Sequence, residues 1–151
     1  MTFFYTPYEA ITPIIPLIPK DIVIWECCDD DGNSNITKVF RSLGYKVITT
    51  GVKENFLEYK PNFHFDMIIT NPPYSLKNEF LKKCYEYNKP FLLLPITALE
   101  GVERGKMFRE HGISVLVLDK RIQYIKGKQN YFNTSWFMYG LSGNIIKFLE
   151  V

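Results

Sequence analysis

The stretch from residue 22 to residue 50 constrains the fold more than any other part of the sequence. Residues 22–26 form an apolar run that ends in a carboxylate, Glu26, as is typical of a parallel strand buried on both faces. An acidic turn follows, then an amphipathic helical pattern over 34–43, Gly44 as a helix stop, and a second apolar run at 45–50. Two strands joined through a helix predict a βαβ unit with a right-handed crossover.

The alternation of strands and helices continues to the end of the chain. No repeat or linker interrupts it, so we expect one domain over residues 1–151. This domain should be α/β and doubly wound, with a mostly parallel, Rossmann-like sheet that ends in a C-terminal antiparallel hairpin. The further strands are predicted at 66–70, 91–95, 114–118, 134–140 and 145–149, and the further helices at 75–88 and from 97 toward 111.

Two helix starts have capping signals. Thr6 followed by Pro7 predicts a short helix with Thr6 as N-cap, which Pro13 soon interrupts. Thr97 and Glu100 predict a capping box for the helix that runs toward residue 111.

Composition excludes several classes of protein. With 151 residues, 46% hydrophobic and 16% aromatic, the chain can bury a core and is not disordered. It has no apolar run near the roughly 18 residues that a membrane helix needs, and no signal-peptide pattern, so we expect a soluble, cytoplasmic protein without a membrane partner. Its three cysteines, at 27, 28 and 84, lack metal-ligand spacing, so no metal site is predicted.

One rigid loop has the strongest chemical signal. Asn71, Pro72, Pro73 and Tyr74 directly follow a short apolar strand. The prolines fix φ at about −65° and cannot donate to a sheet ladder, so the strand ends here and Asn71 is presented in a narrow geometry. The Asn71 side-chain oxygen and the Pro72 carbonyl can accept hydrogen bonds from the NH₂ group of a base, on which Tyr74 can stack. Such a loop suits alkylation of an aromatic exocyclic amine without a strong base.

An Asn-Pro-Pro-Tyr loop after an apolar strand resembles the catalytic motif of the amino-methyltransferases, which methylate adenine N6 or cytosine N4. The resemblance implies a Rossmann-like methyltransferase fold, S-adenosylmethionine as cofactor, and residues 71–74 as the catalytic loop. Family enzymes that choose a DNA sequence carry a target-recognition domain, for which 151 residues leave no room. The chain therefore looks like a small, phage-type version acting in the host cytoplasm, with specificity supplied by a protein partner or by a structured substrate such as RNA.

The resemblance also implies a methyl-donor site built from three segments. The first precedes the first helix, and a helix cap packed on the core is the alternative interpretation for it. The second is the turn after the first strand, and the third follows the second strand. The predicted donor-site residues are Tyr5, Thr6, Pro7, Glu26, Cys27, Asp30, Gly32, Gly51, Asn55 and Phe56.

Three of these positions depart from the family pattern; the mildest is Asn55, in place of an aspartate that reads the adenine amino group, since asparagine can still accept one hydrogen bond. Asp30 stands where the family has its first loop glycine, and Gly51 stands where an acidic residue usually holds the ribose hydroxyls. A side chain at a close-approach, positive-φ position costs about 1 kcal/mol, although aspartate adopts left-handed geometry more readily than most residues. Carboxylates suit a sulfonium or an ammonium group better than a phosphate. The three aspartates at 29–31 therefore argue against a nicotinamide or ATP site.

Two functions are predicted. The first is S-adenosylmethionine-dependent methylation of a nucleobase exocyclic amine in DNA or RNA, with adenine N6 favoured. The second, motivated by Asp30 and Gly51, is a catalytically inactive methyltransferase-like protein that binds a nucleotide, the donor or a protein, for example a phage anti-defence factor. A nucleic acid is the expected partner. The segment from Lys120 to Lys128 is either a solvated loop or a phosphate-binding edge.

Overall fold

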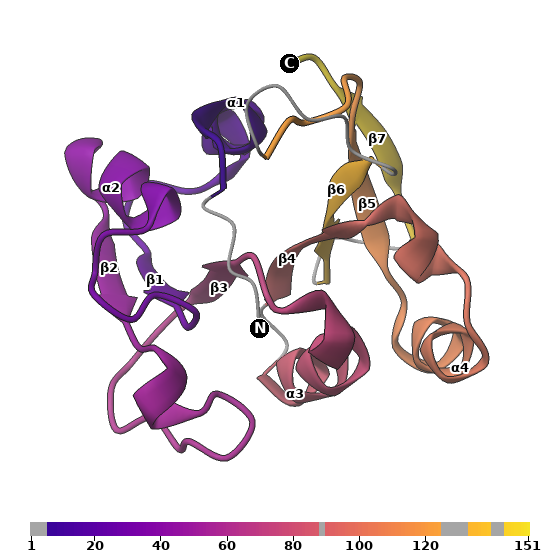
Figure 1. Cartoon of the computed structure of the whole chain (residues 1–151), viewed down its shortest axis with the longest axis horizontal. Coiled ribbons are helices and arrows are strands. Elements are labelled where there is room, and N and C mark those ends of the chain that lie inside the picture. The colour runs from indigo at the N-terminus through magenta and orange to yellow at the C-terminus, as the bar shows by residue number, and fades with distance from the viewer. Residues whose placement is uncertain (1–5, 88–89, 125–132, 140–143) are drawn as a thin grey trace.

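Within the described residues, 6–87, 90–124, 133–139 and 144–151, seven strands form one sheet in the order β2-β1-β3-β4-β6-β5-β7. Figure 1 shows the sheet of this computed structural model with β2 at one edge and β7 at the other. The strands are β1 (Val23–Glu26), β2 (Lys46–Thr49), β3 (Met67–Thr70), β4 (Pro90–Pro95), β5 (Ser114–Leu118), β6 (Thr134–Met138) and β7 (Ile146–Leu149).

The pairing of the strands confirms the predicted α/β class with a mostly parallel sheet. Strands β2, β1, β3 and β4 are parallel to one another, whereas β6 is inserted antiparallel between β4 and β5. The antiparallel pair of the C-terminal part is thus β5 with β6. Because β6 is already paired on both sides, the last strand pairs with the free edge of β5, in parallel, rather than forming a hairpin with β6.

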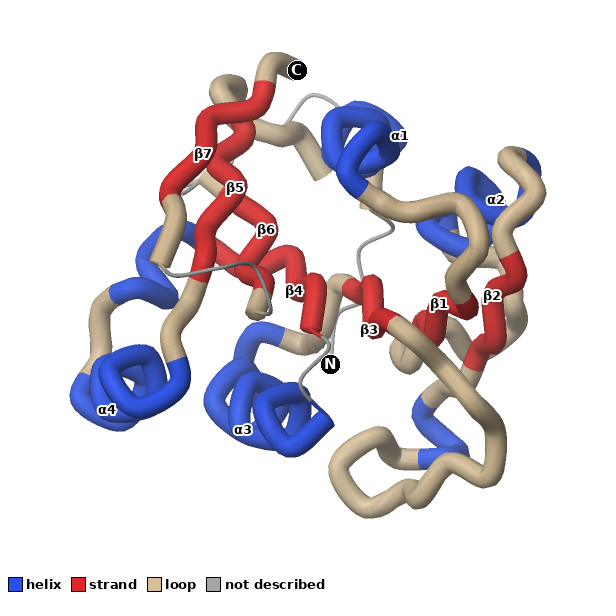
Figure 2. Tube along the Cα trace, turned by 180° about the vertical axis from the view of Figure 1, so that it is seen from behind, coloured by secondary structure: helices blue, strands red, loops and turns tan. Residues whose placement is uncertain are grey.

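Helices cover both faces of the sheet. Figures 1 and 2 show α1 and α2 on one face and α3 and α4 on the other. No helix among the described residues is long and apolar enough to cross a membrane. The helices are α1 (Tyr8–Ile11), η1 (Thr12–Leu17), α2 (Asn35–Ser42), η2 (Val52–Glu54), η3 (Tyr74–Leu76), α3 (Lys77–Tyr87), η4 (Ile96–Leu99) and α4 (Val102–His111), where η marks a 3-10 helix.

Each face of the sheet has its own hydrophobic core, because successive strand residues point to opposite faces. Ile24 of β1 packs with α1 and α2, whereas its neighbour Trp25 packs on the opposite face. The Trp25 indole is surrounded by the rings of five other residues. This aromatic cluster holds the segment that follows β2 against the sheet, and its other members are Phe56, Tyr59, Phe63, Phe65 and Tyr87.

The helix caps differ from the predicted ones. Ser34, which was predicted as the first residue of the helical pattern, is instead the N-cap of α2 and accepts a hydrogen bond from the Thr37 N–H. Pro7, not Thr6, is the N-cap of the short helix α1, since the Thr6 side chain bonds elsewhere. The helix predicted from residue 97 is broken, because Gly101 adopts φ +149° between η4 and α4. The predicted capping box at its start is therefore wrong.

Candidate functional site

The carboxyl ends of β1 and β3 lie side by side and bring two of the predicted segments together. Strand β1 ends at Glu26, and β3 ends at Thr70, one residue before Asn71. The Thr70 hydroxyl donates a hydrogen bond to Glu26 Oε1. The strand order reverses here, since β2 lies on one side of β1 and β3 on the other. In open α/β sheets ligands bind at the carboxyl ends of the strands at such a reversal, which makes this edge the candidate site.

Glu26 is the most unusual residue at this edge, because it is ionisable and yet only 2% exposed. Oε1 also accepts from the Cys28 N–H at 2.9 Å, and Oε2 lies 3.2 Å from the Ser34 hydroxyl oxygen. Burial raises the pKa of Glu26 from 4.5 to about 7, with a further rise from nearby Asp29, against the lowering effect of its hydrogen bonds. No cation among the described residues forms an ion pair with it.

Asp29 closes the turn after β1, a role that the sequence analysis missed. Its Oδ1 accepts from the N–H groups of Asn33 and Ser34 at 3.1 and 3.2 Å, and its Oδ2 accepts from the Thr37 hydroxyl at 2.6 Å. These donors lie at the start of α2, where free N–H groups favour a negative charge. The sequence signal that could have predicted this role is an aspartate placed a few residues before the N-cap of a helix. The first turn of α2 is thus occupied by a side chain of the protein itself.

Asp30 and Gly51 touch each other, so these two departures from the family pattern form one structural feature. A Cβ on Gly51 would lie 2.5 Å from Asp30 Cα and 2.9 Å from Asp30 Cγ. Gly51 has φ −130° and ψ −156°, which any residue adopts, so lack of space is what requires glycine here. Asp30 Oδ1 accepts from the Val52 N–H, and Glu54 Oε2 accepts from the Gly51 N–H at 3.0 Å. Two carboxylates therefore lie at the end of β2, where the resemblance implies one.

The side chain of Asn71 is anchored by the N-terminal segment. Its Nδ2 donates to Thr6 Oγ1 at 3.1 Å, and the Thr6 carbonyl accepts from Asn35 Nδ2 at 2.9 Å. Thr6 is only 5% exposed. No described residue donates a hydrogen bond to Asn71 Oδ1. The predicted N-terminal and catalytic segments, 65 residues apart in sequence, thus meet, with the amide oxygen left as an acceptor.

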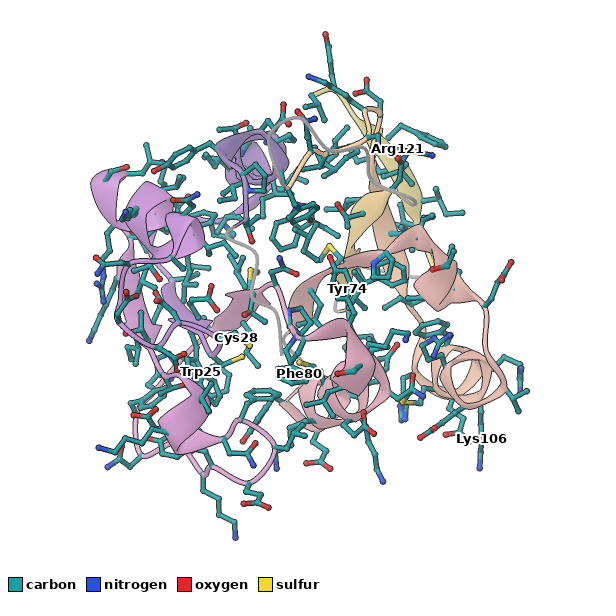
Figure 3. The ribbon with its side chains drawn as sticks, viewed as in Figure 1. Trp25, Cys28, Tyr74, Phe80, Lys106 and Arg121 are labelled. Atoms are coloured by element: carbon teal, nitrogen blue, oxygen red, sulfur yellow. The ribbon has the colours of Figure 1, made fainter. Side chains whose placement is uncertain are left out.

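The rest of the Asn-Pro-Pro-Tyr loop turns toward the interior. Pro72 is buried, and Pro73 and Tyr74 are partly buried. Burial, together with the neighbouring Tyr124 hydroxyl, raises the pKa of Tyr74 far above its usual range. Tyr124 in turn donates to Thr134 Oγ1 at 3.0 Å. The Tyr74 ring therefore packs against the core, and only part of it is accessible from outside. Figure 3 shows Tyr74 near the middle of the molecule.

Two predicted donor-site residues belong to the core. Cys27 is 2% exposed, and burial raises the pKa of its thiol well above its usual value. Phe56 is 3% exposed, and its ring stacks on Phe80 with centroids 4.8 Å apart and lies 5.3 Å from the Trp25 ring. Their side chains have little surface to offer a ligand in this conformation.

The remaining predicted donor-site residues have varied positions. Gly32 has φ +73°, which favours glycine in the turn before α2. Asn55 is exposed and its Oδ1 accepts from the Leu57 N–H at 3.3 Å. Pro7 is partly buried at the start of α1, and Tyr5 lies outside the described residues. Among the described residues, no group of three or more His, Cys, Asp or Glu side chains is placed to hold a metal ion.

The start of the basic segment has acceptor partners in the protein. Lys120 Nζ lies 3.3 Å from Glu9 Oε2, and Arg121 Nε donates to Asn133 Oδ1 at 3.0 Å. Residues 125–128 of this segment lie outside the described residues. In Figure 3, Arg121 and Lys106 lie at the periphery of the molecule, away from Cys28 and the end of β1.

The fold was compared with known proteins. No protein-family model and no curated protein matches the sequence. Among solved structures, a predicted O-methyltransferase, protein Atu636 from Agrobacterium tumefaciens, superposes with a TM-score of 0.51 at 13% identity, covering 97% of this chain and 87% of that one. The chain has a methyltransferase-type fold. The protein-(glutamine-N5) methyltransferase from Alicyclobacillus acidocaldarius has a TM-score of 0.41 at 12% identity, over 89% of this chain and 94% of that one.

Proposed function

We propose that the protein is an S-adenosylmethionine-dependent methyltransferase of a nucleobase exocyclic amine, with adenine N6 as the favoured acceptor. The observation that carries the proposal is the position of Asn71. Its amide is anchored by Thr6, with Oδ1 left as an acceptor, one residue after the Thr70 hydroxyl that bonds to Glu26. An amine-orienting amide and the predicted donor loop are thereby held together at the ligand-binding edge of the sheet.

The chemistry required of this chain is mainly orientation. An exocyclic amine becomes more basic and more tetrahedral as it attacks a methyl group, and acceptors for its N–H groups stabilise that change. Asn71 Oδ1 and the Pro72 carbonyl would accept these hydrogen bonds, and the accessible part of the Tyr74 ring would contact the base. A base in a duplex would have to leave the stack to reach this loop.

The groups around the donor loop suit S-adenosylmethionine in charge. When bound, this donor supplies an electrophilic methyl group on a sulfonium ion, and it also carries an ammonium group and two ribose hydroxyls. Asp30 and Glu54 provide hydrogen-bond acceptors for such groups, and the buried Glu26 lies next to the donor loop; none of the three brings a positive charge. A phosphate-bearing ligand would be repelled by the same set, which agrees with the exclusion of a nicotinamide or ATP site.

The direct test is transfer of labelled methyl groups. The purified protein is incubated with S-adenosylmethionine carrying a labelled methyl group and with single- and double-stranded DNA and RNA, and the digested nucleosides are analysed for N6-methyladenosine and N4-methylcytidine or their deoxy forms. Asn71→Ala should lower the rate by about 100-fold or more, as loss of a transition-state acceptor does. The exposed Asn62→Ala is the matched control and should leave the rate unchanged. Labelled methyl groups that appear only on protein or on hydroxyl groups would refute the proposed acceptor.

The second candidate is a methyltransferase-like binding protein without transferase activity. The crowding of Asp30 against Gly51 favours it, because the Asp30 side chain fills space at the end of β2. Calorimetric titration with S-adenosylmethionine and S-adenosylhomocysteine up to millimolar concentration tests whether the donor site is open, and the methyl-transfer assay then separates the enzyme from an inactive protein that binds the donor. The absence of heat and of a thermal shift with both ligands would leave only a protein that binds a nucleotide or a protein partner.

A further inference from the structure

The polar groups beneath the donor loop form a chain that joins two buried carboxyl groups. Glu26 Oε2 contacts Ser34 Oγ at 3.2 Å, Ser34 Oγ contacts Thr37 Oγ1 at 3.1 Å, and Thr37 Oγ1 contacts Asp29 Oδ2 at 2.6 Å. Glu26, Asp29 and Thr37 are 2%, 4% and 0% exposed, whereas Ser34 is partly exposed, so water has little access to the two carboxyl groups. We assign the hydrogen bonds of the chain from its own four groups.

The chain has one hydrogen too few if both carboxyl groups are ionised. It contains three oxygen–oxygen contacts, but only the Ser34 and Thr37 hydroxyls carry hydrogens, one each. A carboxylate accepts hydrogen bonds and donates none, so one contact would hold two facing lone pairs. A proton on one of the two carboxyl groups supplies the missing hydrogen. With Glu26 protonated, Glu26 donates to Ser34, Ser34 donates to Thr37, and Thr37 donates to Asp29.

The surroundings place this proton on Glu26. Asp29 accepts from two backbone N–H groups at the start of α2 as well as from Thr37, an arrangement that stabilises a negative charge. Glu26 accepts from one backbone N–H group, of Cys28, and from the Thr70 hydroxyl, which remains a donor to Oε1 while Oε2 carries the proton. The raised pKa of Glu26 agrees with this assignment.

Within the part of the chain that the structure describes, the groups that face Glu26 supply no positive charge. The turn after β1 contributes Asp29, which disfavours ionisation of Glu26, and the Cys27 thiol, whose own pKa Glu26 helps to raise. Neighbouring β3 contributes Thr70, which does not titrate in this range. From α2, Arg41 donates to the Val47 carbonyl. A negative charge on Glu26 is thus unbalanced while no ligand is bound.

We propose that Glu26 carries a proton in the ligand-free protein and releases it to solvent when S-adenosylmethionine binds. This inference rests on the proposed function. The ligand has a net positive charge, from a sulfonium and an ammonium group against one carboxylate, and a nearby cation favours the ionised form of a carboxylic acid. One O–H bond of Glu26 breaks, buffer takes up the proton, and the Ser34 hydroxyl turns to donate to Glu26. S-adenosylhomocysteine lacks the sulfonium charge and should release fewer protons.

The experiment is calorimetric titration of the full chain with S-adenosylmethionine in phosphate and in Tris, which differ widely in ionisation enthalpy. The difference in heat gives the number of protons released. We expect about half a proton per ligand at pH 7 and about a tenth at pH 8, following the fraction of Glu26 protonated beforehand. Glu26→Gln should bind the ligand with the same heat in both buffers, since its NH₂ group replaces the proton toward Ser34. Asp31→Asn, an exposed carboxylate in the same turn, is the control and should behave like wild type.

Each outcome decides the matter. Buffer-dependent heat that Glu26→Gln abolishes supports the inference. Binding with equal heat in both buffers overturns it and leaves the proposed function standing. Absence of binding by either ligand removes the proposed function and the release step together. A ¹³C NMR titration of the ligand-free protein tests independently whether Glu26 carries a proton before the ligand binds. A Glu26 carboxyl group that is fully ionised from pH 6 upward refutes the bound proton.

Discussion

The contact between Asp30 and Gly51 predicts that the smallest side chain at position 51 destabilises the protein. In Gly51→Ala the new Cβ meets Asp30 Cα at 2.5 Å and Asp30 Cγ at 2.9 Å, well inside normal carbon–carbon contact. Rotation of the Asp30 side chain does not relieve the contact with Cα, so the backbone of one segment must shift. Overpacking of this kind costs about 1–3 kcal/mol, and we expect about 2 kcal/mol here.

A double-mutant cycle isolates the contact. Asp30→Gly alone removes the acceptor for the Val52 N–H, which is exposed, and adds glycine entropy, for a loss of about 1–2 kcal/mol. In Asp30→Gly/Gly51→Ala the clash with the side chain disappears and the glycine lets the loop move. The double mutant should therefore be more stable than the sum of the single effects by about 1 kcal/mol, as is usual for residues in contact.

The assay is urea unfolding of the four proteins followed by far-UV circular dichroism. Gly105→Ala in α4 is the control, because its Cβ would meet only Arg109 Nη1 at 3.4 Å, and alanine there should raise the free energy of unfolding by about 0.5–1 kcal/mol. A cost below about 0.5 kcal/mol for Gly51→Ala, or strictly additive effects in the cycle, would refute the close approach of the two segments.

Three further predictions concern other parts of the site. Glu26 binds a proton more tightly in the folded state, so the wild type loses stability as pH rises from 4.5 to 7, by at most about 3 kcal/mol. In thermal unfolding, the stability of Glu26→Gln relative to wild type should therefore rise over this pH range. Parallel curves of stability against pH for the two proteins would contradict the raised pKa of Glu26. Thr6→Val should lower the methyl-transfer kcat by about tenfold, because it removes the hydroxyl that anchors the Asn71 amide, whereas Thr6→Ser should keep the wild-type kcat. Equal kcat values for the two variants would show that the anchor is not needed. Phe56→Ala should cost about 3–5 kcal/mol in urea unfolding because its ring stacks on Phe80 within the core, and a loss under about 1 kcal/mol would mean that the ring is at the surface.

Local patterns in the sequence were sufficient to locate most elements. The apolar runs that end at Glu26 and just before Asn71 were correctly predicted as strands. Strands in the middle of a parallel sheet are buried on both faces, so they appear in the sequence as continuous apolar runs. Ser34 and Gly44 bound a helix because capping and positive φ depend on neighbours in the chain. The strand before Asn71 ends for a local reason as well, because the prolines that follow have no N–H group to donate to a neighbouring strand.

The arrangement of the candidate site was decided by tertiary structure. Thr6 looked like a helix cap, yet its hydroxyl accepts from Asn71, a residue that only the sheet brings near. Asp30 and Gly51 looked like two separate departures from a family pattern, but they compensate for each other across the ends of neighbouring strands. Sequence spacing predicts contacts within a helix or a turn, because chain geometry fixes them. Contacts between segments tens of residues apart depend on strand order and register, which the local pattern leaves open.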